Sequence, residues 1–333
     1  MPDAVWFDGP GHVEIRQEPV ASVGPNQVRI EALVSGLSAG SELLVYRGQV
    51  PRDLPPDPPT IGGDFSFPVK FGYASVGRVV EAGSRVALGV GDLVFAHHPH
   101  QTEYVVPADF PIRLPASVPP EVAVFSANLE TAVTVTLDAH PRLGEAVVVM
   151  GQGVVGLLIT MLLRRVGAGP IVTVDAHPRR REASLSAGAD HALGLDADLV
   201  DRVLELTGGR GFDVAVEASG SPGALQTCID SVAFAGTIVV ASWYGTRDAT
   251  LALGGAFHRR RLRVLSSQVS TLDPTVAPRW DRARRTALVT ELLQELPLAP
   301  LVTHRFPFHE AAAAYELLDR TPEDCVQVVL DYV

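Results

Sequence analysis

The sequence predicts an α/β fold with two domains, and three observations support this prediction. The length of 333 residues fits about two domains. Short β-branched runs, punctuated by Gly and Pro, fill the first hundred residues. From about Leu143 onward, apolar strand-like runs alternate with helical stretches, as in a doubly wound parallel sheet.

The N-terminal part is predicted to be a compact, barrel-like β domain. Several short strands with turn signals between them are typical of such a domain. The expected strands are Val28–Val34, Ala74–Val80, Leu93–Ala96 and Tyr104–Val106.

The second part is predicted to be a parallel sheet with helices on both faces, because its strands are almost entirely apolar. The expected strands are Ala146–Met150, Ile171–Asp175, Phe212–Glu217, Thr237–Ala241 and Leu262–Ser266. The expected helices are Val154–Val166, Arg179–Ala187, Ala197–Leu206 and Gly223–Ala233. After Asp273 we expect helices at Arg282–Leu293 and Glu310–Asp319, and strands at Leu301–Phe306 and Val326–Leu330.

The composition narrows the class of protein. Acidic residues outnumber basic ones, 38 to 27, so a general nucleic-acid or anionic-membrane binder is disfavoured. No apolar run reaches the roughly 20 residues of a spanning helix. The two cysteines permit no disulfide framework. We expect a cytoplasmic protein that acts on a small molecule.

A Gly-rich turn indicates a dinucleotide site. Gly151, Gly153 and Gly156 have the G-x-G-x-x-G spacing between a predicted strand and a predicted helix. In such a turn the first glycine permits the tight bend, the second a close approach to the pyrophosphate, and the third packing of helix on strand. Free N–H groups at the helix start face the phosphates. We assign cofactor contacts to Gly151, Gln152, Gly153, Val154, Val155 and Gly156.

An acid at the end of the next strand favours NAD over NADP. Asp175 closes the run IVTVD, about 20 residues beyond the turn. Its carboxylate accepts hydrogen bonds from both ribose hydroxyls and repels a 2′-phosphate. The arginines 179–181 are able to host a phosphate, so NADP stays the disfavoured alternative. We expect Arg180 to fold over the adenine ribose.

With these motifs the chain resembles the medium-chain dehydrogenase/reductase superfamily over nearly its whole length. The resemblance rests on GDLVF, QTEYVVP, LETAVTV, PRLGEAVVVMGQGVVG and FDVAVEASG. It implies a GroES-like (chaperonin-like) β-barrel catalytic domain at 1–137 and 272–333 and a Rossmann domain at 138–271. It also implies that Thr134 touches the nicotinamide ring and assigns Ser219 to the cofactor site. Trp243 either lines the nicotinamide or caps the sheet.

The zinc-dependent branch of this superfamily holds its metal with residues that this chain lacks. SGLSAGSE has Ser38 at the position of the Cys ligand, and GYASVG has Tyr73 at the position of the His ligand. Only Glu130, at the third position, is a metal-binding residue type. A catalytic zinc needs three protein ligands, so we predict no zinc and no other metal. SGLSAGSE, KFGYASVG and HHPHQTEY resemble a zinc-less subgroup that includes the bacteriochlorophyllide hydroxyethyl dehydrogenases, which oxidise a secondary alcohol to a ketone.

Without a Lewis acid, side chains must donate the proton that follows hydride transfer. We take Tyr73 as the first candidate for the donor, with a packed aromatic residue as the equally weighted alternative. Ser41 corresponds to a proton-relay hydroxyl of the zinc enzymes. Glu130 is a candidate to orient Tyr73, accept a substrate hydroxyl or act as a base.

Three histidines form the second candidate cluster. We expect His97 to face solvent or bind loop backbone, because strand alternation separates it from its neighbours. We assign a role in the substrate pocket, such as proton relay, to His98 or His100. A substitute metal site formed by these histidines with Glu130 is the disfavoured alternative.

The predicted function is that of a zinc-independent NAD(H)-dependent oxidoreductase, interconverting a secondary alcohol, polyols and cyclitols included, and its ketone. An NADPH-dependent enoyl or quinone reductase is one alternative. A non-catalytic NAD-binding protein is the other. By analogy with relatives that pair through the last strand of the nucleotide domain, we expect a homodimer.

Overall fold

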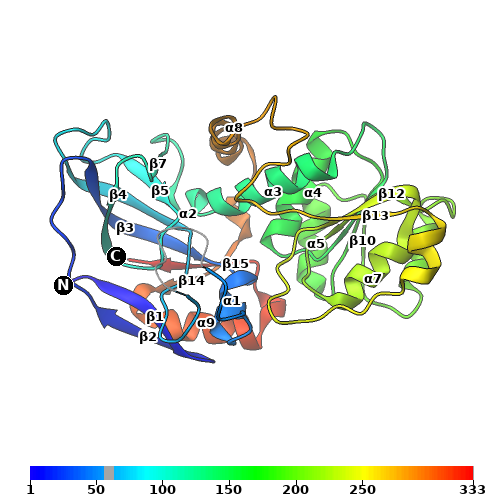
Figure 1. Cartoon of the computed structure of the whole chain (residues 1–333), viewed down its shortest axis with the longest axis horizontal. Coiled ribbons are helices and arrows are strands. Elements are labelled where there is room, and N and C mark those ends of the chain that lie inside the picture. The colour runs from blue at the N-terminus through cyan, green and yellow to red at the C-terminus, as the bar shows by residue number, and fades with distance from the viewer. Residues whose placement is uncertain (56–63, 333) are drawn as a thin grey trace. The chain divides into compact units, whose positions relative to one another are not determined.

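The computed structural model describes residues 1–55 and 64–332 (Figure 1). These form two compact units, one of residues 1–127 with 287–333 and one of residues 128–286. Residues 128–137 and 272–286, which the sequence assigns to the other domain, thus belong to the second unit. Both limits fall within continuous helices, α3 (Ser126–Ala139) and α8 (Arg282–Glu295), so no turn signal marks them.

The first unit contains a large sheet and a separate hairpin. The described strands of the sheet have the order β14-β15-β3-β4-β5-β7, and β6 also pairs with β3. The hairpin is the antiparallel pair β1 and β2. The bounds are β1 (Asp3–Gly9), β2 (His12–Gln17), β3 (Gln27–Leu37), β4 (Ser75–Ala82), β5 (Leu93–Ala96), β6 (Glu103–Pro107), β7 (Ile112–Arg113), β14 (Val302–Pro307) and β15 (Gln327–Asp331).

The long strand β3 organises this sheet. It pairs antiparallel with β4, β6 and β15, so a strand from the end of the chain closes against one from its beginning. Along its first half, buried and more exposed side chains alternate. Val28 and Ile30 therefore point to the same side, where they join Val79, Val94 and Tyr104 in one apolar core.

A second core of the first unit is built around aromatic rings. The ring of Phe7, which is fully buried, meets the ring of Tyr315 edge-on at 5.1 Å, and Tyr46 stacks on Tyr315 at 5.8 Å. Helix α9 buries Ala311, Ala314, Tyr315 and Leu318, the spacing of one helix face. The helices here are α1 (Ser41–Tyr46), α2 (Pro120–Ala123) and α9 (Ala311–Arg320), with short 3₁₀ turns at Ala299–Leu301, Phe308–Glu310 and Pro322–Asp324.

The second unit has the predicted parallel sheet. Its described strands have the order β10-β9-β8-β11-β12-β13, and every pairing is parallel. This is the 3-2-1-4-5-6 order of a Rossmann fold. The strands are β8 (Val147–Met150), β9 (Ile171–Val174), β10 (His191–Leu193), β11 (Phe212–Glu217), β12 (Val232–Val240) and β13 (Arg263–Ser266). Besides α3 and the start of α8, the helices are α4 (Val154–Arg165), α5 (Pro178–Ser186), α6 (Leu199–Glu205), α7 (Pro222–Ser231) and a π-helical turn at Leu253–Phe257.

The predicted fold class, a β-rich domain joined to a doubly wound α/β domain, is confirmed. The sequence missed the hairpin β1–β2, the three-residue strand β10 and the π-helical turn. Strand β2 reads HVEIRQ and is half exposed, so its apolar signal is weak. Strand β10 is too short for a period to be recognised.

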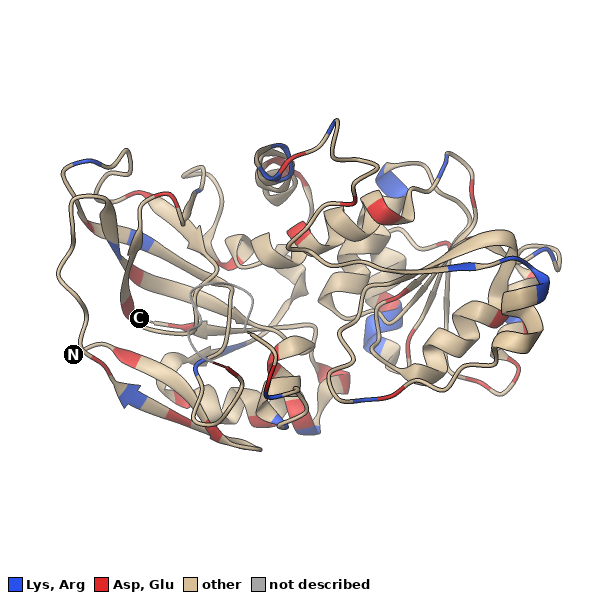
Figure 2. Ribbon diagram, viewed as in Figure 1, with Lys and Arg blue, Asp and Glu red and all other residues tan. Residues whose placement is uncertain are grey.

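The surface and the described helices agree with the composition. Acidic and basic residues lie interspersed along both units (Figure 2). Among residues 1–55 and 64–332, no helix is both long and apolar enough to cross a membrane. Cys228 and Cys325 are buried free thiols.

Replacement of Phe7 by Ala tests the aromatic core. The change removes a fully buried ring that contacts Tyr46 and Tyr315, so we expect the free energy of unfolding in urea to fall by about 3–5 kcal/mol. Phe234, which is 67% exposed, is the control, and Phe234→Ala should change it by no more than about 0.5 kcal/mol. Equal losses in the two variants would contradict the assignment of the core.

Candidate functional site

The Gly-rich turn of the second unit has the geometry that its sequence predicts. Strand β8 ends at Met150, and Gly151 follows with φ of +93°, a left-handed conformation that favours glycine. A Cβ on Gly151 would lie 2.7 Å from the backbone N and Cα of Ser219. The turn therefore needs a residue without a side chain here, both for its conformation and for the neighbouring chain.

The other two glycines have different surroundings. A Cβ on Gly156 would lie 2.0 Å from the carbonyl oxygen of Gly151, so helix α4 packs on the turn only because this residue is Gly. Gly153 is the N-cap of α4, and a Cβ there would meet no atom within 4 Å. The open space at Gly153 leaves room for a ligand beside the first N–H groups of a twelve-residue helix.

Asp175 ties the turn to the end of β9. Its Oδ2 accepts a hydrogen bond from the backbone N–H of Gln152 at 2.7 Å, and its Oδ1 accepts one from His177 at 2.8 Å. Each carboxylate oxygen has further lone pairs, so the group is still able to accept from ribose hydroxyls. Arg181 donates to the carbonyl oxygens of Asp175 and Ala176, which fixes the start of α5.

Three further cofactor residues predicted for this unit lie on α5 and shortly after β11 and β12. Arg180 is half-buried on the first turn of α5. Ser219 lies just after β11, where its N–H and hydroxyl both donate to Oε1 of the buried Glu217. Trp243 follows β12 and is 39% exposed. The sequence did not single out Glu217, which also accepts from Tyr244 at 2.9 Å.

Glu130 and Thr134 lie one turn apart on α3. The Thr134 hydroxyl donates to the carbonyl oxygen of Glu130 at 2.8 Å and accepts from Nη1 of Arg285 at 3.0 Å. Nη2 of Arg285 lies 3.9 Å from the Glu130 carboxylate, and both side chains are buried. Burial lowers the pKa of the Arg285 guanidinium, while Glu130 opposes that shift. The sequence missed Arg285, the cationic partner of Glu130.

In the first unit, three hydroxyls form a chain. The Tyr73 phenol lies 2.9 Å from the Ser41 hydroxyl, which lies 3.2 Å from the Ser38 hydroxyl. Ser38 follows the end of β3, Ser41 opens α1, and Tyr73 precedes β4. Burial, and secondarily the charge of Glu42, raises the pKa of Tyr73 to about 12. Tyr73 is therefore a protonated hydrogen-bond donor at neutral pH.

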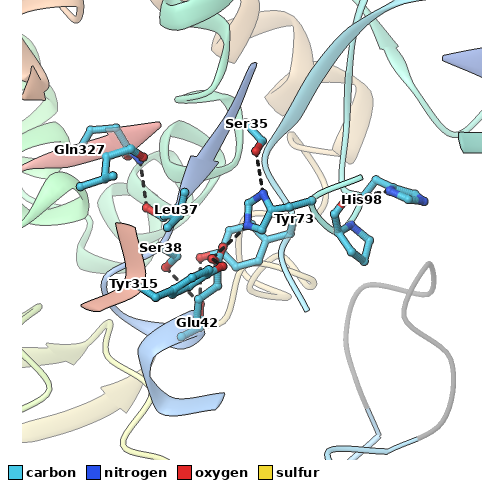
Figure 3. Close-up of polar contacts among 12 residues, drawn as sticks. Ser35, Leu37, Ser38, Glu42, Tyr73, His98, Tyr315 and Gln327 are labelled. Atoms are coloured by element: carbon cyan, nitrogen blue, oxygen red, sulfur yellow. Dashed lines mark hydrogen bonds and ion pairs between the residues drawn. The ribbon is translucent and has the colours of Figure 1, made fainter. Parts of the chain in front are cut away.

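Two of the three histidines have structural partners. The His97 ring packs edge-on against Phe95 at 5.0 Å. His98 is buried and stacks on Tyr104 at 3.7 Å, and its Nδ1 donates to the carbonyl oxygen of Pro99 at 2.9 Å. Burial lowers the pKa of His98 to about 3, so this imidazole is neutral at physiological pH. Figure 3 places His98 well apart from Glu42 and Tyr315.

His100 is the histidine at the centre of a polar network. Its Nδ1 lies 2.7 Å from the Ser35 hydroxyl and its Nε2 lies 3.1 Å from Oε2 of Glu42. Figure 3 marks hydrogen bonds of Ser35 and Glu42 with dashed lines. The Tyr315 hydroxyl donates to the same Glu42 oxygen at 2.6 Å. Ser35, Glu42, His100 and Tyr315 are all completely buried.

The sequence missed Glu42 and Tyr315. Glu42 stands in the stretch SGLSAGSE, directly after Ser41, and an acid among the apolar residues of a short helix was the available signal. Tyr315 lies 273 positions further along the chain, so no local sequence pattern connects it with Glu42.

Comparisons with known proteins show that this chain is similar to dehydrogenases. The model of the zinc-binding dehydrogenase family matches residues 154–284. D-guloside 3-dehydrogenase of Escherichia coli is 27% identical over 324 residues, which cover 91% of this chain and 92% of that protein. The 2-desacetyl-2-hydroxyethyl bacteriochlorophyllide A dehydrogenase of Cereibacter sphaeroides is 26% identical and covers 99% of this chain and 98% of its own.

These similarities support the medium-chain dehydrogenase/reductase superfamily, the family that the sequence predicts. The crystal structure of 2R,3R-butanediol dehydrogenase from Bacillus subtilis has the same fold, with a TM-score of 0.81, 22% identity and full coverage of both chains. The predicted family is thus confirmed. The family model begins after Ser38 and Tyr73, so its match does not test the metal ligands of this medium-chain dehydrogenase/reductase.

Two alanine variants separate packing from cofactor binding in this dehydrogenase/reductase. Gly156→Ala forces a methyl group against the Gly151 carbonyl, so we expect the free energy of unfolding to fall by about 1–3 kcal/mol. Gly153→Ala has space for its methyl group and should unfold like the unaltered protein. It should nevertheless bind NADH about tenfold more weakly, since the backbone must approach the pyrophosphate there. Urea unfolding and fluorescence titration with NADH measure the two effects, and unchanged NADH affinity in Gly153→Ala would argue against this site.

Proposed function

We propose that the chain is a zinc-independent, NAD(H)-dependent oxidoreductase that interconverts a secondary alcohol and its ketone. The observation that carries this proposal is the hydroxyl chain Ser38–Ser41–Tyr73, because it stands at positions where the zinc-dependent relatives are expected to hold their metal. The relatives that match over most of the chain are dehydrogenases by name. This favours alcohol oxidation over the enoyl-reductase and non-catalytic alternatives.

The residues of the second unit fit a nicotinamide dinucleotide. The Gly151–Gly156 turn offers the open approach at Gly153 and the N–H groups at the start of α4 for a pyrophosphate. Asp175 would accept from the ribose hydroxyls, with Arg180 beside it. When bound, the cofactor supplies the hydride donor or acceptor. Thr134, Ser219 and Trp243 are its further expected contacts.

The donor set does not fit a catalytic zinc. Zinc prefers thiolate, imidazole and carboxylate ligands, and Ser38 and Tyr73 offer hydroxyls. The third position, Glu130, already lies beside the Arg285 cation. In the described ranges 1–55 and 64–332, no three His, Cys, Asp or Glu side chains are grouped so as to hold a metal ion. These contacts support chemistry that relies on side-chain donors.

The hydroxyl chain suits proton transfer to a ketone oxygen. As the carbonyl carbon gains a hydride, its oxygen becomes an alkoxide and takes the proton of the Tyr73 phenol. Ser41 then donates its proton to Tyr73 and regains one through Ser38, which is partly exposed. Alcohol oxidation runs through the same bonds in reverse.

Zinc content and ketone reduction test the proposal together. We expect elemental analysis to find no stoichiometric zinc and a panel of ketones to support NADH oxidation. Tyr73→Phe should lower kcat by about 10²–10⁴-fold, because it removes the proton donor. Its NADH affinity should not change. Tyr46→Phe, a buried phenol of the same unit, is the control and should retain full activity.

Three outcomes would contradict the proposed function. Stoichiometric zinc would exclude the metal-independent mechanism. Turnover of enones but not of ketones would favour the reductase alternative. An unchanged rate in Tyr73→Phe would remove this phenol from the reaction.

Cofactor preference gives a separate test. The Asp175 carboxylate would repel a 2′-phosphate, so we expect NADPH to bind at least about tenfold more weakly than NADH. Asp175→Asn should weaken NADH binding and lower the ratio of the NADPH dissociation constant to the NADH dissociation constant. Asp190→Asn is the matched control, since Asp190 also accepts a backbone N–H bond, from Ile171, but pairs with Arg164. Fluorescence titration measures both ratios, and equal or tighter binding of NADPH by the unaltered protein would overturn the preference for NAD.

A further inference from the structure

Glu42 is a buried carboxylate that the proposed reaction does not use. Its side chain is completely buried on α1. One oxygen, Oε2, receives the Tyr315 hydroxyl at 2.6 Å and lies 3.1 Å from Nε2 of His100. Its other oxygen, Oε1, has no hydrogen-bond partner among the residues that the structure describes. A carboxylate buried in this way needs a strong reason for its retention, because desolvating a charge is costly.

The hydrogen bonds around Glu42 have one consistent direction. An ionised Glu42 only accepts, so Nε2 of His100 must carry a proton. In the neutral ring Nδ1 then accepts from the Ser35 hydroxyl, and Ser35 accepts in turn from the Tyr332 hydroxyl at 2.8 Å. Every donor of this chain points toward Glu42, and the network holds one net negative charge.

One added proton would neutralise the pair of Glu42 and His100. An imidazolium beside the carboxylate, or a carboxyl group beside a neutral ring, carries no net charge. Ser35 and the half-buried Tyr332 give this proton a hydrogen-bonded route to Nδ1.

The pair lies close to Tyr73. Gly72, directly before Tyr73, has φ of +139°, and a Cβ there would lie 2.6 Å from Nε2 of His100. The backbone of the Tyr73 segment is therefore in contact with the imidazole. On the other side, Ser41, which bonds Tyr73, is the neighbour of Glu42 on α1.

The other titratable groups that face the pair are uncharged at neutral pH. Tyr73, Tyr315 and Tyr332 surround Glu42, and burial raises the pKa of each phenol. His98, which faces His100, has its pKa lowered by burial. The charge that Tyr73 experiences from this network is thus the charge of Glu42 and His100.

We propose that Glu42 and His100 are a pair of positioning residues whose net charge sets how firmly Tyr73 holds its proton. When the pair is anionic, Tyr73 remains a phenol, the form needed to protonate an alkoxide. When the pair gains a proton, Tyr73 releases its own more easily, the form needed to accept a proton from an alcohol. The catalytic consequence rests on the proposed function, whereas the effect on the phenol does not.

A fluorine probe tests the effect on the phenol without any assay of activity. The protein is prepared with 3-fluorotyrosine at position 73, whose phenol is more acidic than that of tyrosine, and its ionisation is followed by ¹⁹F NMR against pH. Glu42→Gln keeps the shape of the side chain and removes its charge. We expect its ¹⁹F transition to move to lower pH by about one unit.

A variant that keeps Glu42 and all its partners is the control. Glu18→Gln removes a different carboxylate of the same unit, which pairs with Lys70. It should leave the transition within about 0.3 pH units of its original position. An unmoved transition in folded Glu42→Gln would overturn the proposal, as would an equal shift in Glu18→Gln.

A second variant covers the case that Glu42→Gln fails to fold. The double variant Glu42→Met with Tyr315→Phe removes the carboxylate together with a hydroxyl that would lose its acceptor, and replacement of buried charges by apolar groups is often tolerated. It should show the same shift to lower pH. A transition that stays in place would count against the pair in the same way.

The kinetic measurement separates this proposal from the proposed function. With a ketone that the unaltered protein reduces, we expect the alkaline limb of the pH–activity profile to lie at lower pH in Glu42→Gln. The displacement should be about equal to the shift that ¹⁹F NMR gives. Glu42→Asp, which keeps the charge, should restore the original profile. Absence of ketone reduction by the unaltered protein would refute the proposed function alone. An altered ¹⁹F transition with an unaltered pH profile would refute the role of the pair in the reaction.

Discussion

The completely buried carboxylate of Glu42 is the constraint on which the polar interior of the first unit depends. A charge without water must find donors, and here they come from distant parts of the chain. His100 follows β5, Tyr315 lies on α9, and Ser35 belongs to β3. Each partner has to be fixed in place for the charge to be tolerated. The same contacts that satisfy Glu42 therefore hold α1, α9 and the His100 loop together.

The candidate residues of the two units were not equally predictable from the sequence. The Gly-rich turn is local, because its strand, its three glycines, its helix and Asp175 all lie between Val147 and Asp175. The residue type itself shows where glycine is needed. The turn, the acid and the parallel sheet could accordingly be predicted. The hydroxyl chain was predicted in part, since Ser41 and Tyr73 were singled out but their contact at 2.9 Å was not foreseeable.

What could not be predicted depends on contacts between residues far apart in the sequence. Glu42 and Tyr315 are separated by 273 positions, and Thr134 and Arg285 by 151. A side chain's burial and partner decide whether it is a base, a donor or part of an ion pair, and neither follows from spacing along the chain. His98 illustrates this, because its stacking on Tyr104 and its bond to the Pro99 carbonyl distinguish it from His100, which contacts Ser35 and Glu42. The limits of the two units were missed for a related reason, since both lie inside helices that continue without a turn signal.

Two buried acids, one in each unit, also bear on how the proposed reaction could run without a metal. A zinc ion would supply positive charge for nearby carboxylates, so a chain that replaces metal ligands by Ser38 and Tyr73 must stabilise such acids in another way. In the second unit Glu130 lies beside the buried Arg285 cation. In the first unit Glu42 has His100 and the Tyr315 hydroxyl. These two solutions differ in chemistry: a guanidinium keeps its charge over the physiological range, whereas an imidazole can gain or lose a proton. Glu130 thus lies beside a guanidinium, whereas Glu42 lies beside an imidazole, near the phenol that is proposed to carry the proton.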